Sequence, residues 1–230
     1  MKVLLINGSP HAHGCTRTAL DIVARELERN GIETEVVHVG HKDIRGCIGC
    51  YKCRELGRCV FDNDLVNGRS SESHQARLYG RVVTDVDVIN EVAKKFEEAD
   101  GLVIGSPVYY AGPNGTLISF LNRLFFSTSF PKRFKVGAAV VSARRAGTGN
   151  TLDQLNKYFL HGEMPVASSR YWNEVHGNTP EEVLQDEEGC QIMRVLGRNM
   201  AFLIKAIARQ REAVGLPEQE PKRIATNFIK

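Results

Sequence analysis

Four of the six cysteines in this chain of 230 residues lie within one short stretch. They are Cys47, Cys50, Cys53 and Cys59, so three thiols follow one another at intervals of three residues and a fourth comes soon after. A thiolate is a soft metal ligand, and a set of four is typical of iron–sulfur clusters and of zinc sites. Five basic residues surround these thiols with positive charge, which favours the thiolate form: Lys42, Arg45, Lys52, Arg54 and Arg58.

Other uses of this cysteine stretch remain open. Structural zinc sites commonly use two Cys-x2-Cys pairs that are well separated along the chain, so zinc ranks below a cluster. A redox-sensing thiol loop is also compatible with the spacing, whereas disulfides are rare in reducing compartments. The remaining cysteines, Cys15 and Cys190, lie far from the stretch, and we expect them to pack as small apolar side chains.

The composition describes an ordinary globular protein. A net charge of +3 is too small to favour nucleic acid or an anionic membrane as a partner. Met1 and Lys2 lead directly into an apolar run, without the pattern of a secretory signal, and no run is long enough to span a bilayer. We therefore expect a cytoplasmic protein with no nucleic-acid partner and no membrane partner.

Short apolar runs alternate with amphipathic segments along most of the chain. The runs predict buried strands at 3–6, 34–39, 102–105, 136–141 and 164–166, and the segments between them predict helices at 16–30, 86–99, 116–126, 151–159 and 191–213. This alternation is typical of a doubly wound α/β domain with a five-stranded parallel sheet and helices on both faces. We expect one domain at 1–213, with a cysteine loop at 46–60, an inserted loop at 68–85 and a C-terminal tail at 214–230.

Ligands of such folds bind at the carboxyl ends of the strands, here the loops 8–16, 106–116, 142–149 and 167–177. The first loop joins a strand to a helix N-terminus, where free N–H groups and the helix dipole favour an anion. Ser9, Thr16 and Arg17 add donors. The loop lacks both Gly-Lys-Ser/Thr and G-x-G-x-x-G, so a phosphate monoester such as that of FMN suits it better than a triphosphate or a dinucleotide. A tight turn with a capped helix is the alternative.

The second and third loops suit a flat ring. Tyr109 and Tyr110 lie in a loop constrained by proline and glycine, where aromatic faces can flank a planar system. Arg144, in a turn that contains Gly147, could stabilise negative charge on a reduced flavin. Each feature also has a purely structural explanation: tyrosines that cover the end of the sheet, and an exposed arginine that binds nothing.

Three motifs together resemble the NADPH-dependent FMN reductase group of flavodoxin-like proteins: Gly8-Ser9-Pro10 with Gly14-Cys15-Thr16, Gly105 to Tyr110, and Tyr171 to Gly177. With the cysteine stretch, the chain is most similar to iron–sulfur flavoproteins. The resemblance implies a flavodoxin-like fold, FMN as cofactor, and Cys47, Cys50, Cys53 and Cys59 as ligands of a [4Fe–4S] cluster. The FMN-binding residues it implies are Ser9, His11, Cys15, Thr16, Arg17, Pro107, Val108, Tyr109, Tyr110, Ser142, Ala143, Arg144 and Gly147.

The resemblance also implies an activity. We expect an FMN-dependent oxidoreductase that passes electrons from NAD(P)H or another donor through FMN and the cluster to a small-molecule or protein acceptor. Tyr109, Tyr110 and His176 are candidates for positioning a substrate or relaying a proton. Members of the group are commonly homodimers or homotetramers. Two alternatives are a cluster-free NAD(P)H-dependent reductase of flavin, quinone, azo or nitro compounds, and a non-catalytic flavodoxin-like protein whose cysteine loop binds zinc or senses redox state.

Overall fold

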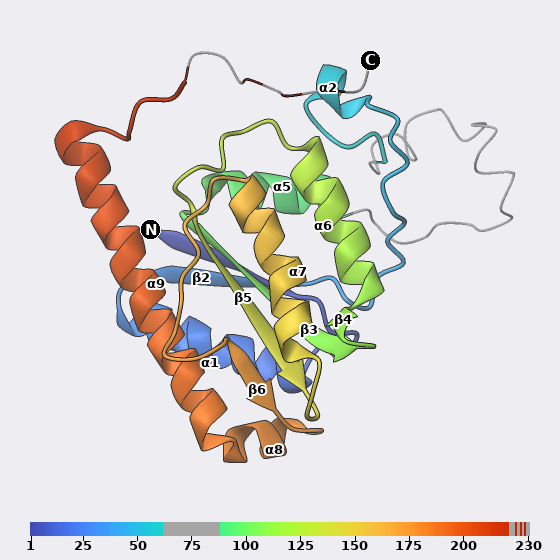
Figure 1. Cartoon of the computed structure of the whole chain (residues 1–230), viewed down its shortest axis with the longest axis vertical. Coiled ribbons are helices and arrows are strands. Elements are labelled where there is room, and N and C mark those ends of the chain that lie inside the picture. The colour runs from blue at the N-terminus through green and yellow to red at the C-terminus, as the bar shows by residue number, and fades with distance from the viewer. Residues whose placement is uncertain (62–87, 221–223, 225, 227, 229–230) are drawn as a thin grey trace, which may run out of the picture.

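The structure, a computed structural model, describes residues 1–61, 88–220, 224, 226 and 228 (Figure 1). The inserted loop expected at 68–85 lies outside these residues, and its role stays a prediction. Among the described residues, no helix is both long enough and apolar enough to cross a membrane.

A parallel sheet forms the centre of the molecule, as the sequence predicts. Its five parallel strands lie in the order β2-β1-β3-β5-β6, and the two-residue strand β4 pairs with β3 in the antiparallel direction to complete a six-stranded sheet. The strands are β1 (Lys2–Asn7), β2 (Glu33–His38), β3 (Gly101–Tyr109), β4 (Gly112–Pro113), β5 (Val136–Ala143) and β6 (Glu174–His176). The strand order reverses between β1 and β3, which is where doubly wound folds bind their ligands.

The last strand differs from the prediction. Residues 164–166 form only an isolated bridge between Val166 and Gly137, and the final strand is β6. The bridge consists of two hydrogen bonds, from Gly137 N to Pro165 O and from Ala167 N to Gly137 O, and Pro165 has no N–H with which to extend the ladder. The edge position beside the carboxyl half of β5 is taken instead by β6.

Helices cover both faces of the sheet. One face carries α1 (Cys15–Arg29) and α9 (Glu187–Val214), and the other carries α5 (Ile89–Glu98), α6 (Gly115–Ser127) and α7 (Thr148–His161). Two shorter helices, α2 (Cys53–Leu56) and α8 (Pro180–Gln185), complete the described part.

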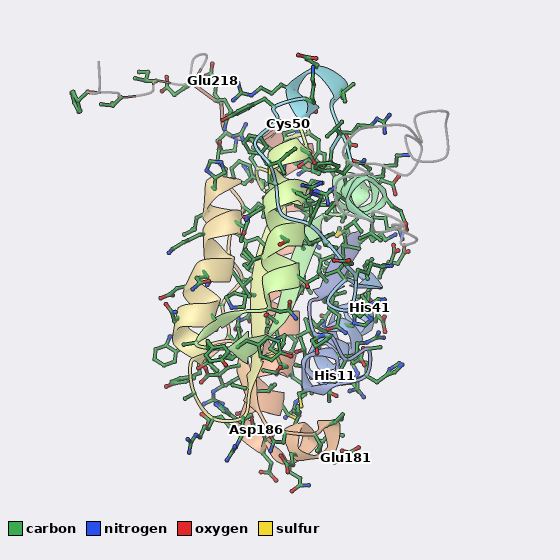
Figure 2. The ribbon with its side chains drawn as sticks, turned by 90° about the vertical axis from the view of Figure 1, so that its right-hand side faces the viewer. His11, His41, Cys50, Glu181, Asp186 and Glu218 are labelled. Carbon is green, nitrogen blue, oxygen red and sulfur yellow. The ribbon has the colours of Figure 1, made fainter. Side chains whose placement is uncertain are left out.

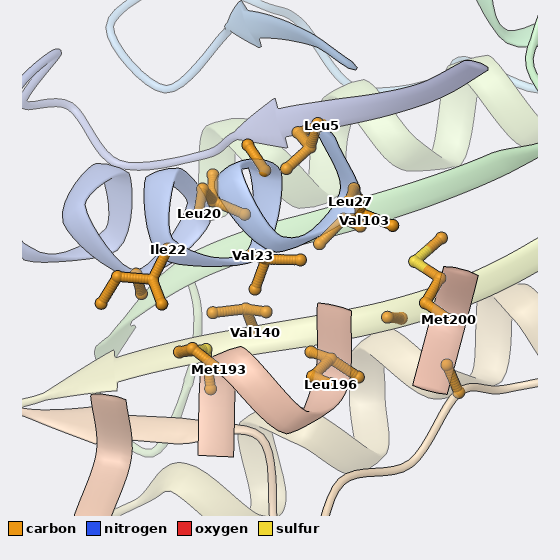
Figure 3. Packing of buried hydrophobic residues seen from close by; sticks show 14 of the residues in the cluster. Leu5, Leu20, Ile22, Val23, Leu27, Val103, Val140, Met193, Leu196 and Met200 are labelled. Atoms are coloured by element: carbon orange, nitrogen blue, oxygen red, sulfur yellow. The ribbon is translucent and has the colours of Figure 1, made fainter. Parts of the chain in front are cut away.

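Alternate residues of a strand contribute to the hydrophobic cores on the two faces of the sheet. In β1, Leu5 packs toward α1 and α9, whereas Leu4 packs toward α5 and α6, because successive side chains of a strand point to opposite faces. Figure 3 shows the first of these cores, where Leu20 and Val23 of α1 lie close to Leu196 of α9 over the sheet. A rigid sheet with both faces covered leaves the strand-end loops to form the site.

Candidate functional site

Hydrogen bonds of the Asn7 side chain fix the conformation of the first strand-end loop. Asn7, fully buried at the end of β1, accepts a hydrogen bond from Ser9 N at 3.1 Å and donates to the carbonyls of His11 and Ala12, both at 3.4 Å. Gly14 caps α1 without a side-chain hydrogen bond, and the first turn of α1 has no acidic residue. The N–H groups of this turn can therefore donate hydrogen bonds to an anion, which is the ligand that the sequence predicts here.

The predicted phosphate-binding residues surround this turn. Thr16 is buried, and its Oγ1 shares a hydrogen bond with Ser142 Oγ at 2.7 Å, which ties the first loop to the third. Cys15 Sγ donates to Gly177 O at 3.5 Å, and burial raises the pKa of the Cys15 thiol, so this side chain stays neutral beside an anion. His11 is exposed. Arg17 forms an ion pair with Asp21 at 2.7 Å, which offsets part of its charge.

The second loop is a strained hairpin. Val108 and Tyr109 of β3 pair with Pro113 and Gly112 of β4, so Tyr110 and Ala111 form a two-residue turn with φ values of 50° and 57°. A turn with two positive φ values is the type I′ turn, which ordinarily uses asparagine, aspartate or glycine. Two residues with side chains in this conformation store backbone strain, a feature that concentrates at functional sites. Tyr109 is half-exposed, and Tyr110 stands fully in solvent at the tip.

The third loop packs closely against this hairpin. Gly147 has a φ of 86°, and a Cβ there would lie 2.9 Å from Ala111 Cα. Asn150 Nδ2 donates to Ala111 O at 2.6 Å. Ser142 and Ala143 are buried at the end of β5, and Arg144 is exposed. The loop thus presents a backbone edge beside the hairpin, and it carries two exposed arginines, Arg144 and Arg145.

The fourth loop closes the same edge of the sheet. His176 N donates to Asp186 Oδ2 at 2.7 Å, and His176 Nδ1 lies 3.8 Å from the same oxygen. Gly177 N donates to Ala143 O at 3.0 Å, so this loop contacts the third one. The structure therefore brings Ser9, Thr16, Ser142 and His176 to one edge, with Tyr109 on the adjacent hairpin.

Three residues at this edge were missed by sequence reasoning. Asn7 and Asn150 hold loop carbonyls, and His38 Nε2 donates to Ser9 O at 2.7 Å. Burial lowers the pKa of His38, and the nearby charges of His41, Arg17 and Lys42 lower it further. The available signal was position: Asn7 ends the apolar run of β1, and His38 follows the apolar pair Val36-Val37 at the end of β2.

The cysteine stretch forms a second site. All four cysteines line one small pocket together with Phe61, Arg123 and Phe126, which we call the cysteine pocket. Cys47 and Cys50 are exposed, Cys53 is half-buried, and Cys59 is buried; none forms a disulfide. Burial raises the pKa of Cys53, and the other three cysteines raise it further. Within the described ranges, no three Cys, His, Asp or Glu side chains are grouped as ligands of a single metal ion.

The two sites lie at opposite ends of α6. Asn114 caps this helix beside the hairpin, and Cys53 Sγ lies 3.8 Å from the carbonyl of Phe126 near its other end. The 13 residues of α6 rise about 1.5 Å each, which separates the sites by about 20 Å. In Figure 2, Cys50 lies near one end of the molecule and His11 lies in the opposite half. The sequence order alone, with the cysteine loop following β2, does not reveal this separation.

The sequence of the chain is similar to those of known flavoproteins. The sequence profile of the NADPH-dependent FMN reductase family matches residues 1–179. An iron–sulfur flavoprotein of Methanocaldococcus jannaschii is 33% identical over 221 residues, which cover 91% of this chain and 100% of that protein.

Solved structures support the fold. RosB with a bound 8-demethyl-8-formylriboflavin-5′-phosphate intermediate superposes with a TM-score of 0.64 at 17% identity, over 100% of this chain and 96% of RosB. A flavodoxin from Archaea gives a TM-score of 0.54 at 14% identity, over 89% of this chain and 99% of the flavodoxin. The chain therefore belongs to the NADPH-dependent FMN reductase family: it is an NAD(P)H-dependent flavin oxidoreductase with a flavodoxin-like fold and FMN as its cofactor.

Proposed function

We propose that this protein is an oxidoreductase of the iron–sulfur flavoprotein type. Electrons from NAD(P)H or another reduced donor pass through FMN to a [4Fe–4S] cluster, and from there to a small-molecule or protein acceptor. FMN supplies the ability to accept a two-electron hydride and release single electrons, which is the form a cluster accepts. The name of the relative from Methanocaldococcus jannaschii supports this class.

The strand-end loops supply the FMN site in this proposal. The N–H groups of the first turn of α1 and the hydroxyl of Thr16 hold the phosphate, and the hairpin with Tyr109 flanks the ring. Arg144 offsets negative charge on the reduced ring. The full set that we assign to FMN is Ser9, His11, Cys15, Thr16, Arg17, Pro107, Val108, Tyr109, Tyr110, Ser142, Ala143, Arg144 and Gly147. Tyr109, Tyr110 and His176 remain the candidates for positioning a substrate.

One observation carries the cluster proposal: the four thiols share a single pocket. We assign Cys47, Cys50, Cys53 and Cys59 as its ligands. A single zinc ion would draw its ligands to about 2.3 Å from one point, whereas a cluster binds each thiolate through a different iron and needs more widely spaced sulfurs. Four thiols in one pocket match the four ligands that a [4Fe–4S] cluster needs.

The separation of the two sites bears on assembly. Within one chain, an electron would cross about the length of α6, roughly 20 Å. An assembly that places the cysteine pocket of one subunit against the FMN site of another shortens this path. We therefore propose a homodimer or homotetramer in which the two sites meet between subunits.

Anaerobic purification with metal and flavin analysis tests the proposal. We expect one FMN and about four irons per chain, with broad cluster absorption beside the flavin bands. Cys53→Ala should lose most of the iron and keep FMN, whereas Cys190→Ala, a buried cysteine outside the cysteine pocket, should keep both. FMN without iron would favour the cluster-free reductase, and zinc in place of iron would refute the cluster.

A further inference from the structure

Cys59 is held by the protein body more firmly than the other three thiols. It is 8% exposed, whereas Cys47 and Cys50 lie in the open part of the loop. The side chain of Asn90, at the start of α5, accepts a hydrogen bond from Cys59 N at 2.9 Å and donates one to Cys59 O at 3.0 Å. This reciprocal pair fixes the backbone of Cys59 against α5.

The sulfur of Cys59 is held by a buried arginine. Arg123 projects from the inward face of α6 and is only 2% exposed. Its Nε lies 3.4 Å and its Nη2 3.2 Å from Cys59 Sγ, and Nη2 also donates to Phe61 O at 3.2 Å. Two nitrogens of this guanidinium therefore lie beside a candidate ligand sulfur, in a place shielded from solvent.

We infer that Arg123 is a positioning residue for the iron–sulfur centre, a conclusion that rests on the function proposed above. It directs the sulfur of Cys59 into the cysteine pocket and raises the reduction potential of the cluster. When one electron from a reductant enters the cluster, no bond in the protein forms or breaks, and the negative charge of the cluster rises by one. A fixed positive charge with N–H groups on a ligand sulfur stabilises the more negative, reduced form.

Arg45 provides a matched control. Its guanidinium lies 4.4 Å from the centroid of the Phe61 ring, and that of Arg123 lies 5.2 Å from the same centroid. Arg45 is exposed, however, and solvent screens its charge. Removing either arginine changes the net charge equally, so a difference between the two variants reports what is local to Arg123, its contact with Cys59 Sγ and its shielded charge.

The experiment measures the midpoint potential of the cluster by dye-mediated titration with electron paramagnetic resonance, in wild type, Arg123→Met, Arg123→Lys and Arg45→Met. We expect Arg123→Met to lower the potential by at least the 59 mV that corresponds to a tenfold change in a one-electron equilibrium. Arg123→Lys should restore part of the shift, and Arg45→Met should stay close to wild type. The FMN content of each variant reports whether it is folded, because the proposed FMN site lies at the other end of α6.

Three outcomes decide the inference. Equal shifts in Arg123→Met and Arg45→Met, or no shift in either, would overturn it. Loss of iron from Arg123→Met with FMN retained, and iron kept by Arg123→Lys and Arg45→Met, would support the positioning role. Absence of iron from the wild type would instead refute the proposed function itself, so the two failures are distinguishable.

Discussion

Thr16 and Ser142 share a buried hydrogen bond of 2.7 Å, although 126 residues separate them in the sequence. This bond joins the loop after β1 to the end of β5, across the intervening strand β3. It ties the first turn of α1 to the third strand-end loop at one edge of the sheet.

Replacing Thr16 should therefore weaken FMN binding. Thr16→Val keeps the shape of the side chain and removes both the bond to Ser142 and a donor for the phosphate. A hydrogen bond to a charged group contributes about 1.5–3 kcal/mol, so we expect the FMN dissociation constant to rise roughly tenfold to a hundredfold. Quenching of flavin fluorescence measures it. Thr18→Val, whose hydroxyl donates to Gly14 O, is the control, and equal losses in both variants would contradict the role of Thr16.

Alanine in place of each of two glycines in the same segment should change the free energy of unfolding in opposite directions. Gly147→Ala places a Cβ 2.9 Å from Ala111 Cα at a φ of 86°, and we expect it to lower the free energy of unfolding by about 1–3 kcal/mol. Gly149→Ala meets no atom within 4 Å in the first turn of α7, and alanine should raise that free energy by about 0.5–1 kcal/mol. Urea denaturation of the two variants measures both changes. Destabilisation by Gly149→Ala as large as that by Gly147→Ala would refute the packing argument.

The strain in the hairpin predicts a stabilising substitution. Ala111 has a φ of 57° at the second turn position, where glycine is favoured. We expect Ala111→Gly to raise the free energy of unfolding by about 1 kcal/mol. Ala93→Gly, in the interior of α5, should lower it by a similar amount. If thermal unfolding shows both variants destabilised equally, the turn is not strained.

His38 predicts a pH dependence of stability. Burial lowers the pKa of His38 in the folded state below its ordinary value of 6.5, so the unfolded chain takes up a proton first as the pH falls. Above pH 6.5, His38 does not lower the free energy of unfolding. Below pH 6.5 that free energy falls as the pH falls, until the pH has passed the folded-state pKa of His38. His38→Gln retains a donor for Ser9 O and should flatten this part of the profile. Denaturation series between about pH 7.5 and 5 measure the slope, and an unchanged slope would show that other groups cause it.

The first three strand-end loops could be predicted because each follows an apolar run that forms a buried strand. Thr16 and Ser142 were expected near the same cofactor for this reason. The fourth, expected at 167–177 after a strand at 164–166, instead contains β6. The contacts of Asn150 and Arg123 could not be predicted, since their partners are a backbone carbonyl and a thiol in other loops.

The position of the cysteine pocket could also not be predicted from the sequence pattern. The segment after β2 runs beside α6, with Gly46 next to Ser119 and Cys53 next to Phe126. In its described part, residues 39–61, the only regular element is the four-residue helix α2, which has no periodicity that would reveal the direction of the chain. Arg123 gave one signal, a charged residue within the apolar run of α6, but its partner becomes apparent only when α6 and the loop lie together.

The most direct test of the central claim is to follow the cluster signal by electron paramagnetic resonance after anaerobic mixing with NADH or NADPH. Protein that carries FMN and iron should develop the signal of a reduced [4Fe–4S] cluster, and the same protein stripped of FMN should develop it only after FMN is restored. A cluster signal of equal size and rate without FMN, or none in protein that carries both groups, would contradict an electron path from the donor through FMN to the cysteine pocket.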